Sequence, residues 1–344
     1  MRLAGRGHAV TVYAENDQPG ARGDVSVHGV RVRFRRRPRW GAASVLAYDC
    51  ACLLDACRGY DLVYMLGYGA AWACWWPRVF GTPVWINVDG LEWARSKWGR
   101  FARAYLRWME WVSGWAATRV IADARAIADR FRQLYPRRAC DCIAYGAQVV
   151  DECGMDAQAL GPWGLEPRQY LLVVARPEPE NHILEIIEGY LQYHGPWSLV
   201  IAGVIPGATP YQRRLLELAG ARVRFIGGVY DERLLQGLRF HAAAYLHGHS
   251  VGGTNPSLLE ALACGNWVIA HDNPFNREVA RDAADYFQTP AQLAACLEDW
   301  QRREGDERAA RGARARQIVQ TFYDWERITD AYERLMRQEC GHAR

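Results

Sequence analysis

The chain has 344 residues, of which 50% are hydrophobic and 23% charged, which is ordinary for a soluble globular protein long enough for two domains. The net charge of +4 is too small to indicate nucleic acid binding, and no apolar run reaches the length of a membrane span. The ten cysteines include no Cys-x-x-Cys pair, so we expect no metal site, and thiols that stay reduced, as in a cytoplasm.

The first residues have an unusual pattern. Residues 1–8 are typical of the end of a helix and its glycine stop, and a strand is predicted over 9–13. An α/β domain seldom begins within a helix. We therefore expect an upstream strand and helix to be missing, or the true start to lie earlier.

A basic cluster follows. Residues 28–34 alternate apolar and basic side chains, which predicts an edge strand. Binding to an anionic inner-membrane surface fits the cluster, but a solvated edge that resists strand pairing fits it as well. The cluster consists of Arg31, Arg33, Arg35, Arg36, Arg37 and Arg39.

The first half continues as alternating strands and helices. Helices are predicted over 44–57, over 97–117 and from 123, and strands over 61–65, 83–88, 119–122 and 143–147. Trp72, Trp75 and Trp76 lie on a further helix. We interpret them as core rather than as an apolar face for a lipid-linked acceptor, because buried aromatics dominate ordinary packing.

Two acidic residues follow the strand over 83–88. Since α/β proteins place ligands at the carboxyl ends of parallel strands, Asp89 and Glu92 are candidates to bind sugar hydroxyls or to act as acid or base. The alternative is that Asp89 begins a turn and Glu92 caps the following helix.

A second strand–helix series begins after residues 151–168, which lack apolar periodicity and predict a linker. Strands are predicted over 170–175, 197–203, 223–228, 242–246 and 267–270, with helices between and after them. The repeated alternation predicts an α/β protein of two doubly wound Rossmann-like domains that face each other across a cleft. We expect domains over 1–150 and 169–320, and a C-terminal helix over 321–344 that packs back on the first domain.

The stretch 247–262 joins a buried strand to a helix through a loop of glycines and small polar residues. Pro256 fits the first helical position with Asn255 as cap, and such a helix start suits an anion such as a diphosphate. The alternative is a tight turn with a capping box from Ser257 to Glu260.

Other strand ends carry candidate ligand contacts. Arg176 follows the strand over 170–175, where a guanidinium suits a diphosphate. Gly227 and Gly228 let a ligand approach the backbone, and Tyr230 is expected near a base.

Five pieces of the chain resemble GT-B glycosyltransferases of family 4, and more narrowly the bacterial rhamnosyltransferases with the domain of unknown function 1972 at their N-terminus. The pieces are 87–93, 143–147, 174–181, 247–262 and 275–280. The resemblance implies retaining transfer of a deoxyhexose, L-rhamnose from TDP-rhamnose, onto a lipid-linked saccharide in cell-surface polysaccharide synthesis. It implies no metal or cofactor beyond the nucleotide-sugar donor, and a cytoplasmic enzyme at the inner membrane face.

The resemblance also implies residue roles. Glu260 matches the second Glu of a Glu-x7-Glu signature, which holds the donor ribose, and Arg176 matches the arginine at the donor diphosphate. Asp89 and Glu92 fall on the acceptor side and, with Arg176, are the expected catalytic residues. The expected donor-binding residues are Arg176, Gly227, Gly228, Tyr230, His249, Gly253, Thr254, Asn255, Ser257 and Glu260.

The chain departs from the family pattern at three places. Gly252 replaces the first Glu of the signature, Asn181 replaces a lysine that usually follows the arginine, and the first strand with its Gly-rich loop is absent. These departures keep open a catalytically inactive nucleotide-sugar-binding paralogue. A dinucleotide-dependent oxidoreductase would need a Gly-x-Gly-x-x-Gly turn after a strand, and we find none.

Overall fold

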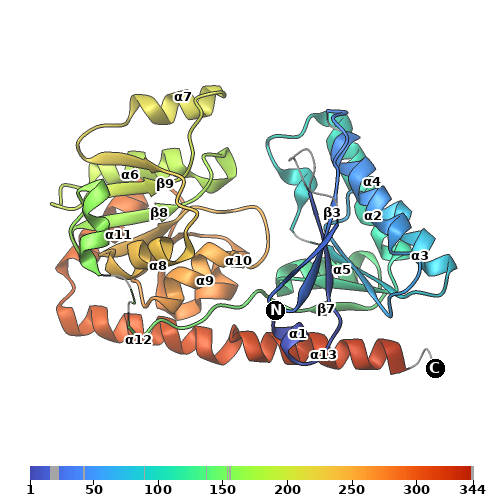
Figure 1. The fold of residues 1–344 in the computed structure, drawn as a ribbon. Helices are drawn as coiled ribbons and strands as arrows, with labels where there is room; N and C mark the ends of the chain where they lie inside the picture. The colour runs from blue at the N-terminus through green and yellow to red at the C-terminus, as the bar shows by residue number, and fades with distance from the viewer. Residues whose placement is uncertain are drawn as a thin grey trace. The chain divides into compact units, whose positions relative to one another are not determined.

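The computed structural model of the chain describes residues 1–15, 23–41, 43–88, 90–136, 138–152, 154 and 156–341. The chain forms two compact units, which are described separately here (Figure 1). Unit 1 comprises Met1–Ala94, Trp98–Ile143 and Glu326–Arg344, and unit 2 comprises Arg95–Lys97 and Ala144–Trp325.

Unit 2 is built on a six-stranded parallel sheet, in the order β10-β9-β8-β11-β12-β13. Alternate residues of its strands enter two apolar clusters, one on each face: Leu172 lies in one cluster and Leu171 in the other. Burial on both faces explains why these strands are continuous apolar runs in the sequence. The strands are β8 (Tyr170–Val174), β9 (Ser198–Ala202), β10 (Val223–Gly227), β11 (Ala244–His247), β12 (Val268–His271) and β13 (Ala284–Phe287).

Helices cover both faces of this sheet. α6 and α11 pack on one cluster through Ile186 and Leu293, and α9 and α12 pack on the other through Leu258 and Ile318. The helices are α6 (Ile183–Gln192), α7 (Pro210–Glu217), α8 (Glu232–His241), α9 (Pro256–Ala263), α10 (Pro274–Ala280), α11 (Pro290–Arg302) and α12 (Gly305–Phe322). Short 3-10 turns are η3 (Ala157–Trp163), η4 (Pro179–Asn181) and η5 (Arg281–Ala283).

Unit 1 contains two sheets. One has the order β1-β3-β2, and the other is parallel with the order β4-β5-β6-β7. The strands are β1 (Thr11–Glu15), β2 (Asp24–Val27), β3 (Val30–Arg35), β4 (Val63–Leu66), β5 (Val84–Val88), β6 (Arg119–Ala122) and β7 (Cys140–Cys142). The helices are α1 (Arg2–Gly5), η1 (Ala71–Cys74), α2 (Ala43–Asp55), α3 (Trp75–Val79), η2 (Glu92–Ala94), α4 (Arg100–Ala116) and α5 (Arg125–Leu134).

A groove of about 1420 Å³ separates the two sheets of unit 1. Its walls include β1 and β4, which are the end strands of their sheets, and residues of α2. Met336 and Cys340 of α13 (Trp325–Gly341) also line it.

The C-terminal helix α13 contacts the start of the chain. Arg6, just after α1, pairs with Asp330 at 2.6 Å and with Glu333 at 3.1 Å. Hydrogen bonds from His8 and Arg6 lower the pKa of Glu333 to about 2. From Glu326 onward, α13 therefore belongs to unit 1 although it follows unit 2 in sequence.

Three sequence interpretations need correction. β3 is the middle strand of its sheet, paired with both β1 and β2, and not an edge strand. The predicted linker contains η3, whose Leu160 is fully buried in the core of unit 2. Trp72 and Trp75 are exposed and not core, because the residues of this segment that turn inward are small ones such as Ala73.

Among the described residues, no helix combines the length and the apolar character needed to cross a bilayer.

Gly312 of α12 tests the packing that holds α9 in place. A Cβ at this position would lie 2.6 Å from the carbonyl oxygen of Gly265, just beyond the end of α9. We expect Gly312→Ala to lower the free energy of unfolding by ~1–3 kcal/mol, although alanine is the better helix former. Urea denaturation measures the change.

Gly305 supplies the matched control, since it lies in the same helix and a Cβ there would meet nothing within 4 Å. Gly305→Ala should leave stability unchanged or raise it by up to ~1 kcal/mol. Equal stability of the two variants would contradict the close approach of α12 to Gly265.

Candidate functional site

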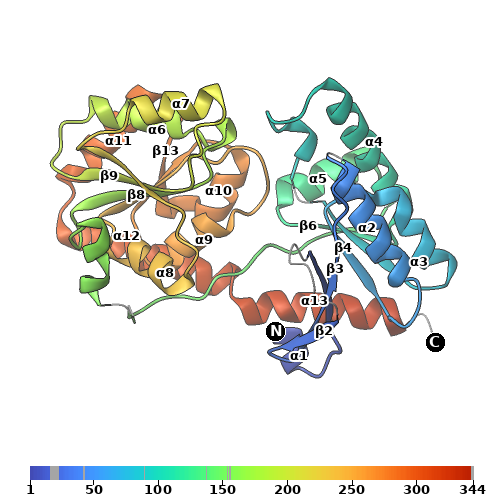
Figure 2. The same ribbon diagram turned by 45° about the horizontal axis from the view of Figure 1, so that its top comes forward.

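The sheet of unit 2 reverses its strand order at β8. The chain passes from β8 to β9 and β10 on one side, and then returns to β11 on the other side of β8. Loops that leave two neighbouring parallel strands in opposite directions open a crevice at their carboxyl ends, where α/β proteins bind ligands. The loops after β8 and β11 therefore form the candidate site; β8 is labelled in unit 2 in Figure 2.

Arg176 lies two residues beyond β8 and is exposed. In the described part of the chain its guanidinium contacts no carboxylate, so its charge is available to a ligand. The backbone carbonyl of Arg176 accepts a hydrogen bond of 2.8 Å from the Asn181 side chain. This bond fixes the turn between Arg176 and η4.

The loop after β11 is fastened to the loop after β8. Nδ1 of His249 lies 2.8 Å from Oδ1 of Asn181, and the backbone N–H of Ser250 donates to the Glu180 carbonyl at 3.0 Å. A Cβ at Gly248 would lie only 2.0 Å from the Asn181 carbonyl oxygen. Only glycine lets the two backbones come this close.

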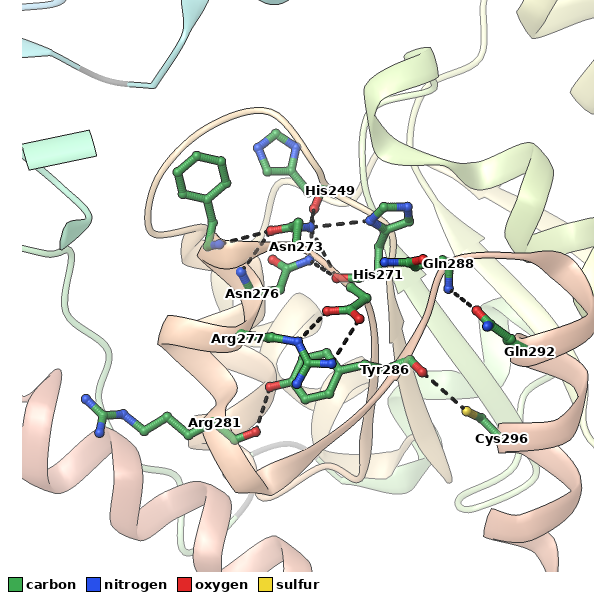
Figure 3. A network of polar contacts seen from close by, with 12 residues as sticks. His249, His271, Asn273, Asn276, Arg277, Arg281, Tyr286, Gln288, Gln292 and Cys296 are labelled. Atoms are coloured by element: carbon green, nitrogen blue, oxygen red, sulfur yellow. Dashed lines mark hydrogen bonds and ion pairs between the residues drawn. The ribbon is translucent and has the colours of Figure 1, made fainter. Parts of the chain in front are cut away.

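Asn276 of α10 and Asn273, the N-cap of this helix, hold the same loop from the other side (Figure 3). The Asn276 side chain donates to the carbonyls of His249 at 2.9 Å and His271 at 2.8 Å. The Asn273 amide nitrogen donates to the His249 carbonyl at 3.0 Å, while its oxygen caps the start of α10. The segment from His247 to Ser250 is thus fixed by neighbours on both sides.

The histidines at the end of β11 are neutral at neutral pH. Burial, with smaller contributions from neighbouring positive groups, lowers the pKa of His247 to about 3, and burial lowers the pKa of His249 to about 4. Neutral His249 donates its Nδ1–H to the Asn181 amide oxygen. These two histidines therefore bring no positive charge to a bound anion.

The start of α9 has the predicted cap. Asn255 is the N-cap, and its side chain accepts from the backbone N–H of Ser257 at 2.9 Å, with Pro256 at the first helical position. The alternative capping box is wrong, because Ser257 contacts the Tyr245 hydroxyl at 2.8 Å instead. Gly252, with φ of +137°, turns the loop into this start, next to the buried residues Gly253 and Thr254.

Glu260 forms an ion pair that sequence analysis missed. Its carboxylate lies 2.6 Å from the guanidinium of Arg239 in α8, which also donates to Ser257 at 3.0 Å. The Arg239 side chain is 4% exposed and that of Glu260 47%, so the pair presents the carboxylate at the surface. No local pattern marks Arg239, because its partner lies on a different helix.

Gly227, the last residue of β10, and Gly228 and Tyr230 after it lie farther along the same edge of the sheet, since β9 separates β10 from β8. Gly227 has a φ of +77°, and a Cβ at Gly228 would lie 2.7 Å from the Val204 side chain. Tyr230 is almost fully exposed.

In unit 1, Asp89 lies outside the described residues. Glu92 is half-buried in η2, and its carboxylate accepts a hydrogen bond of 3.0 Å from the Trp98 indole. The alternative role of Glu92 as a helix cap is wrong, because α4 has Gly99 as its N-cap and no side-chain capping bond.

The basic cluster of unit 1 is partly neutralised. Arg33 pairs with Asp24 at 2.9 Å and with Asp55 at 2.7 Å, and Arg35 also pairs with Asp55. Arg37 pairs with Glu15 at 3.1 Å. The exposed members are Arg31, Arg36 and Arg39. Across the described part of the chain, no cluster of three or more His, Cys, Asp or Glu side chains is placed to hold a metal ion.

The buried imidazole of His247 makes stability depend on pH. Its pKa is lower in the folded chain than the ordinary value of 6.5, so between about 6.5 and 3 the unfolded chain binds a proton that the folded chain excludes. The free energy of unfolding should therefore fall as the pH falls below about 6.5, by up to ~1.4 kcal/mol per pH unit from this residue.

Thermal unfolding followed between pH 7 and pH 4.5 tests this expectation. His247→Gln should flatten the pH dependence, while His194→Gln, at an exposed position of unit 2, should leave it as in the parent chain. A slope unaffected by His247→Gln would show that this imidazole is not buried in its neutral form.

Comparison with known families covers both halves of the chain. The profile of a glycosyl transferase 4-like domain matches residues 2–146, and that of the glycosyl transferases group 1 matches residues 162–318. A search of curated proteins found no match.

Several solved structures have a similar fold. Sucrose-phosphate synthase from Thermosynechococcus elongatus has a TM-score of 0.78 at 17% identity, with 98% of this chain and 90% of that chain covered. For α,α-trehalose 6-phosphate synthase from Burkholderia multivorans the TM-score is 0.75 at 14% identity, with 97% and 92% covered. For HepE from Anabaena, solved in complex with UDP and glucose, the TM-score is 0.73 at 17% identity, with 90% and 86% covered.

At these identities the structural likeness shows the fold alone, namely two Rossmann-like α/β domains. The family matches add the identity of each domain. The chain is therefore a GT-B glycosyltransferase, with a glycosyl transferase 4-like first domain and a group 1 glycosyl transferase second domain.

Proposed function

We propose that this chain transfers a deoxyhexose, L-rhamnose from TDP-rhamnose, with retention of anomeric configuration, to a lipid-linked saccharide in cell-surface polysaccharide synthesis. One observation supports the donor site: Asn181 and His249 connect the loop that contains Arg176 to the loop before α9. This connection holds an unpaired guanidinium near a capped helix start, two groups that attract a diphosphate.

The donor would bind along the carboxyl edge of the sheet in unit 2. Arg176 and the N–H groups at the start of α9 bind the diphosphate, with Gly253 and Thr254 beside the sugar and phosphates. Glu260 accepts hydrogen bonds from the ribose hydroxyls, since one carboxylate oxygen is held by Arg239 and the group is half exposed. Tyr230, beyond Gly228, would contact the base.

Transfer requires no nucleophile from the protein. The bond between the sugar carbon and the diphosphate oxygen breaks, and a bond to the acceptor oxygen forms on the same face of the sugar. The acceptor hydroxyl proton passes to the leaving diphosphate. Arg176 and the helix start stabilise the charge that develops on the diphosphate. Asp89 and Glu92 bind the hydroxyls of the acceptor or act as acid or base.

The choice of donor and acceptor rests on the family resemblance of the sequence. HepE, one of the similar structures, was solved with UDP and with UDP-glucose, so a UDP-hexose is the first alternative donor. Contact with the inner membrane surface through the basic cluster would depend mainly on Arg36 and Arg39, since Arg33, Arg35 and Arg37 are paired and Arg31 lies 3.9 Å from Asp24.

A second candidate function is nucleotide-sugar binding without transfer. It is favoured by Gly252 and Asn181, which stand where the family pattern has a glutamate and a lysine. Asn181 is committed to Arg176 and His249, so it does not replace the missing positive charge.

Calorimetric titration with TDP, UDP, GDP and NAD tests the donor site. We expect micromolar binding of TDP, weakened about tenfold or more by Glu260→Ala, because loss of a charged hydrogen-bond acceptor removes ribose contacts. Glu298→Ala, at an exposed carboxylate on α11, is the matched control and should bind like the parent chain.

Thermal unfolding of Glu260→Ala separates lost contacts from lost folding, because this change also leaves Arg239 without its partner. Unchanged TDP binding by a folded Glu260→Ala chain would contradict the assignment of Glu260. Preferential binding of NAD would contradict a nucleotide-sugar donor site.

Transfer from TDP-rhamnose to a lipid-linked acceptor tests Arg176. We expect Arg176→Ala to lower turnover about 10²–10³-fold, the usual effect of removing one donor that stabilises a developing anion. Arg233→Ala, at an exposed arginine of α8, is the control. Near-normal turnover of Arg176→Ala would refute the role, and TDP binding without transfer from TDP-rhamnose or a UDP-hexose would favour the binding-only function.

A further inference from the structure

The outer side of α4 in unit 1 carries a stripe of exposed aromatic residues. Phe101, Trp108, Trp111 and Trp115 are 84%, 54%, 50% and 49% exposed. With Ala104 they recur at intervals of three and four residues, which places them within an arc of about 80° on the helix surface. A surface helix ordinarily has polar residues on this side.

Other positions of α4 already provide the core contacts of this helix. Leu106, Met109 and Val112 are buried, and Ser113 and Ala116 are inaccessible to solvent. The exposed aromatics are thus additional to the core contacts of α4. Large apolar patches of this kind mark binding surfaces.

The neighbouring helix α3 extends the patch. Arg78 of α3 donates to the carbonyls of Trp115 at 2.8 Å and Ala116 at 3.1 Å, so the ends of α3 and α4 lie side by side (Figure 2). Trp72 and Trp75 are exposed, and so are Val79 and Phe80. We call this surface the aromatic face, which comprises Trp72, Trp75, Val79, Phe101, Trp108, Trp111 and Trp115.

Positive charge borders the aromatic face. Arg100, Arg103 and Arg107 are exposed on the adjoining strip of α4. The guanidinium of Arg138 lies 4.1 Å from the ring centre of Trp115, and that of Arg78 lies 4.7 Å from the ring centre of Trp75.

The acidic residue of α4 is withdrawn from this surface. Glu110 is buried, pairs with Arg130 and accepts a hydrogen bond of 3.0 Å from the Trp93 indole. The exposed side of α4 therefore carries arginines and aromatics and no carboxylate.

This combination matches the surface of an anionic bilayer. Tryptophan prefers the boundary between headgroups and acyl chains, and arginine beside it reaches the lipid phosphates. A helix of 17 residues is about 26 Å long, and it can lie in the plane of the membrane with its aromatic stripe inserted.

We propose that unit 1 binds the surface of an anionic lipid bilayer through the aromatic face of α3 and α4, with the arginines of α4 at the headgroups. This surface is separate from the basic cluster of β3. It does not depend on the donor or acceptor proposed above, because binding of vesicles requires neither.

Co-sedimentation with vesicles tests the proposal. The full chain should sediment with vesicles of phosphatidylglycerol and phosphatidylcholine, and more weakly with phosphatidylcholine alone. The triple variant Trp108→Ser, Trp111→Ser, Trp115→Ser should bind at least about tenfold more weakly, since each change removes an interfacial anchor. The triple variant Arg100→Gln, Arg103→Gln, Arg107→Gln should lose the preference for phosphatidylglycerol.

Trp40 provides a control for single changes. It is 68% exposed in unit 1 and lies outside the aromatic face, so Trp40→Ser should bind like the parent chain, whereas Trp111→Ser should bind more weakly. Circular dichroism and thermal unfolding of each variant check that the chain is folded.

Three outcomes would overturn the proposal. One is equal vesicle binding by the tryptophan triple variant and the parent chain, and another is an equal loss in Trp40→Ser. The third is a parent chain that binds no vesicles and is a dimer by light scattering, while the tryptophan triple variant is a monomer. That result would assign the aromatic face to a contact between two copies of this chain.

Discussion

The close approach of two backbones at Gly248 and Asn181 is the constraint on which the candidate site of unit 2 depends. Strands β8 and β11 are hydrogen-bonded neighbours, but their loops leave in different directions. They stay together because Gly248 has no side chain and because His249 and Ser250 bond to residues of η4 and its flank. Arg176 is thereby held near the start of α9, whose direction follows from its packing against α12 at Gly265.

The side chain at position 181 holds the backbone of the site and carries no charge for a ligand. The family pattern of the sequence has a lysine here, where a second positive charge would serve a diphosphate. In this chain the amide of Asn181 donates to the Arg176 carbonyl and accepts from His249, so both ends of the side chain hold the backbone. The two buried histidines are neutral. A diphosphate bound here would meet the Arg176 guanidinium and backbone N–H groups, and the positive charge of Arg95 also acts on His249.

Sequence patterns predicted the features that depend on neighbouring residues. The cap at Asn255 and the first helical position at Pro256 are set within one turn of helix, and the strands of unit 2 were recognisable as apolar runs. Features set by distant residues were missed. Arg239 meets Glu260 from another helix, and β3 becomes a middle strand because β2 folds back onto it. The linker prediction failed because Leu160 is buried by partners that are far away in sequence.

In helix α4, the residues that pack against the rest of unit 1 differ from those that we propose to bind the membrane. Its inner side needs the apolar residues that it has, and the ion pair of Glu110 with Arg130 satisfies a buried charge that would otherwise be costly. The aromatic residues of its outer side are less important for folding. Burial of apolar surface contributes ~25 cal/mol per Å², and these side chains remain about half exposed, so only part of their surface contributes. Four aromatics in register on that side therefore reflect a constraint outside unit 1. The surface of a bilayer is flat and accepts both indoles and guanidinium groups. The aromatic residues would lie at the boundary with the acyl chains, and the arginines would point toward the lipid phosphates.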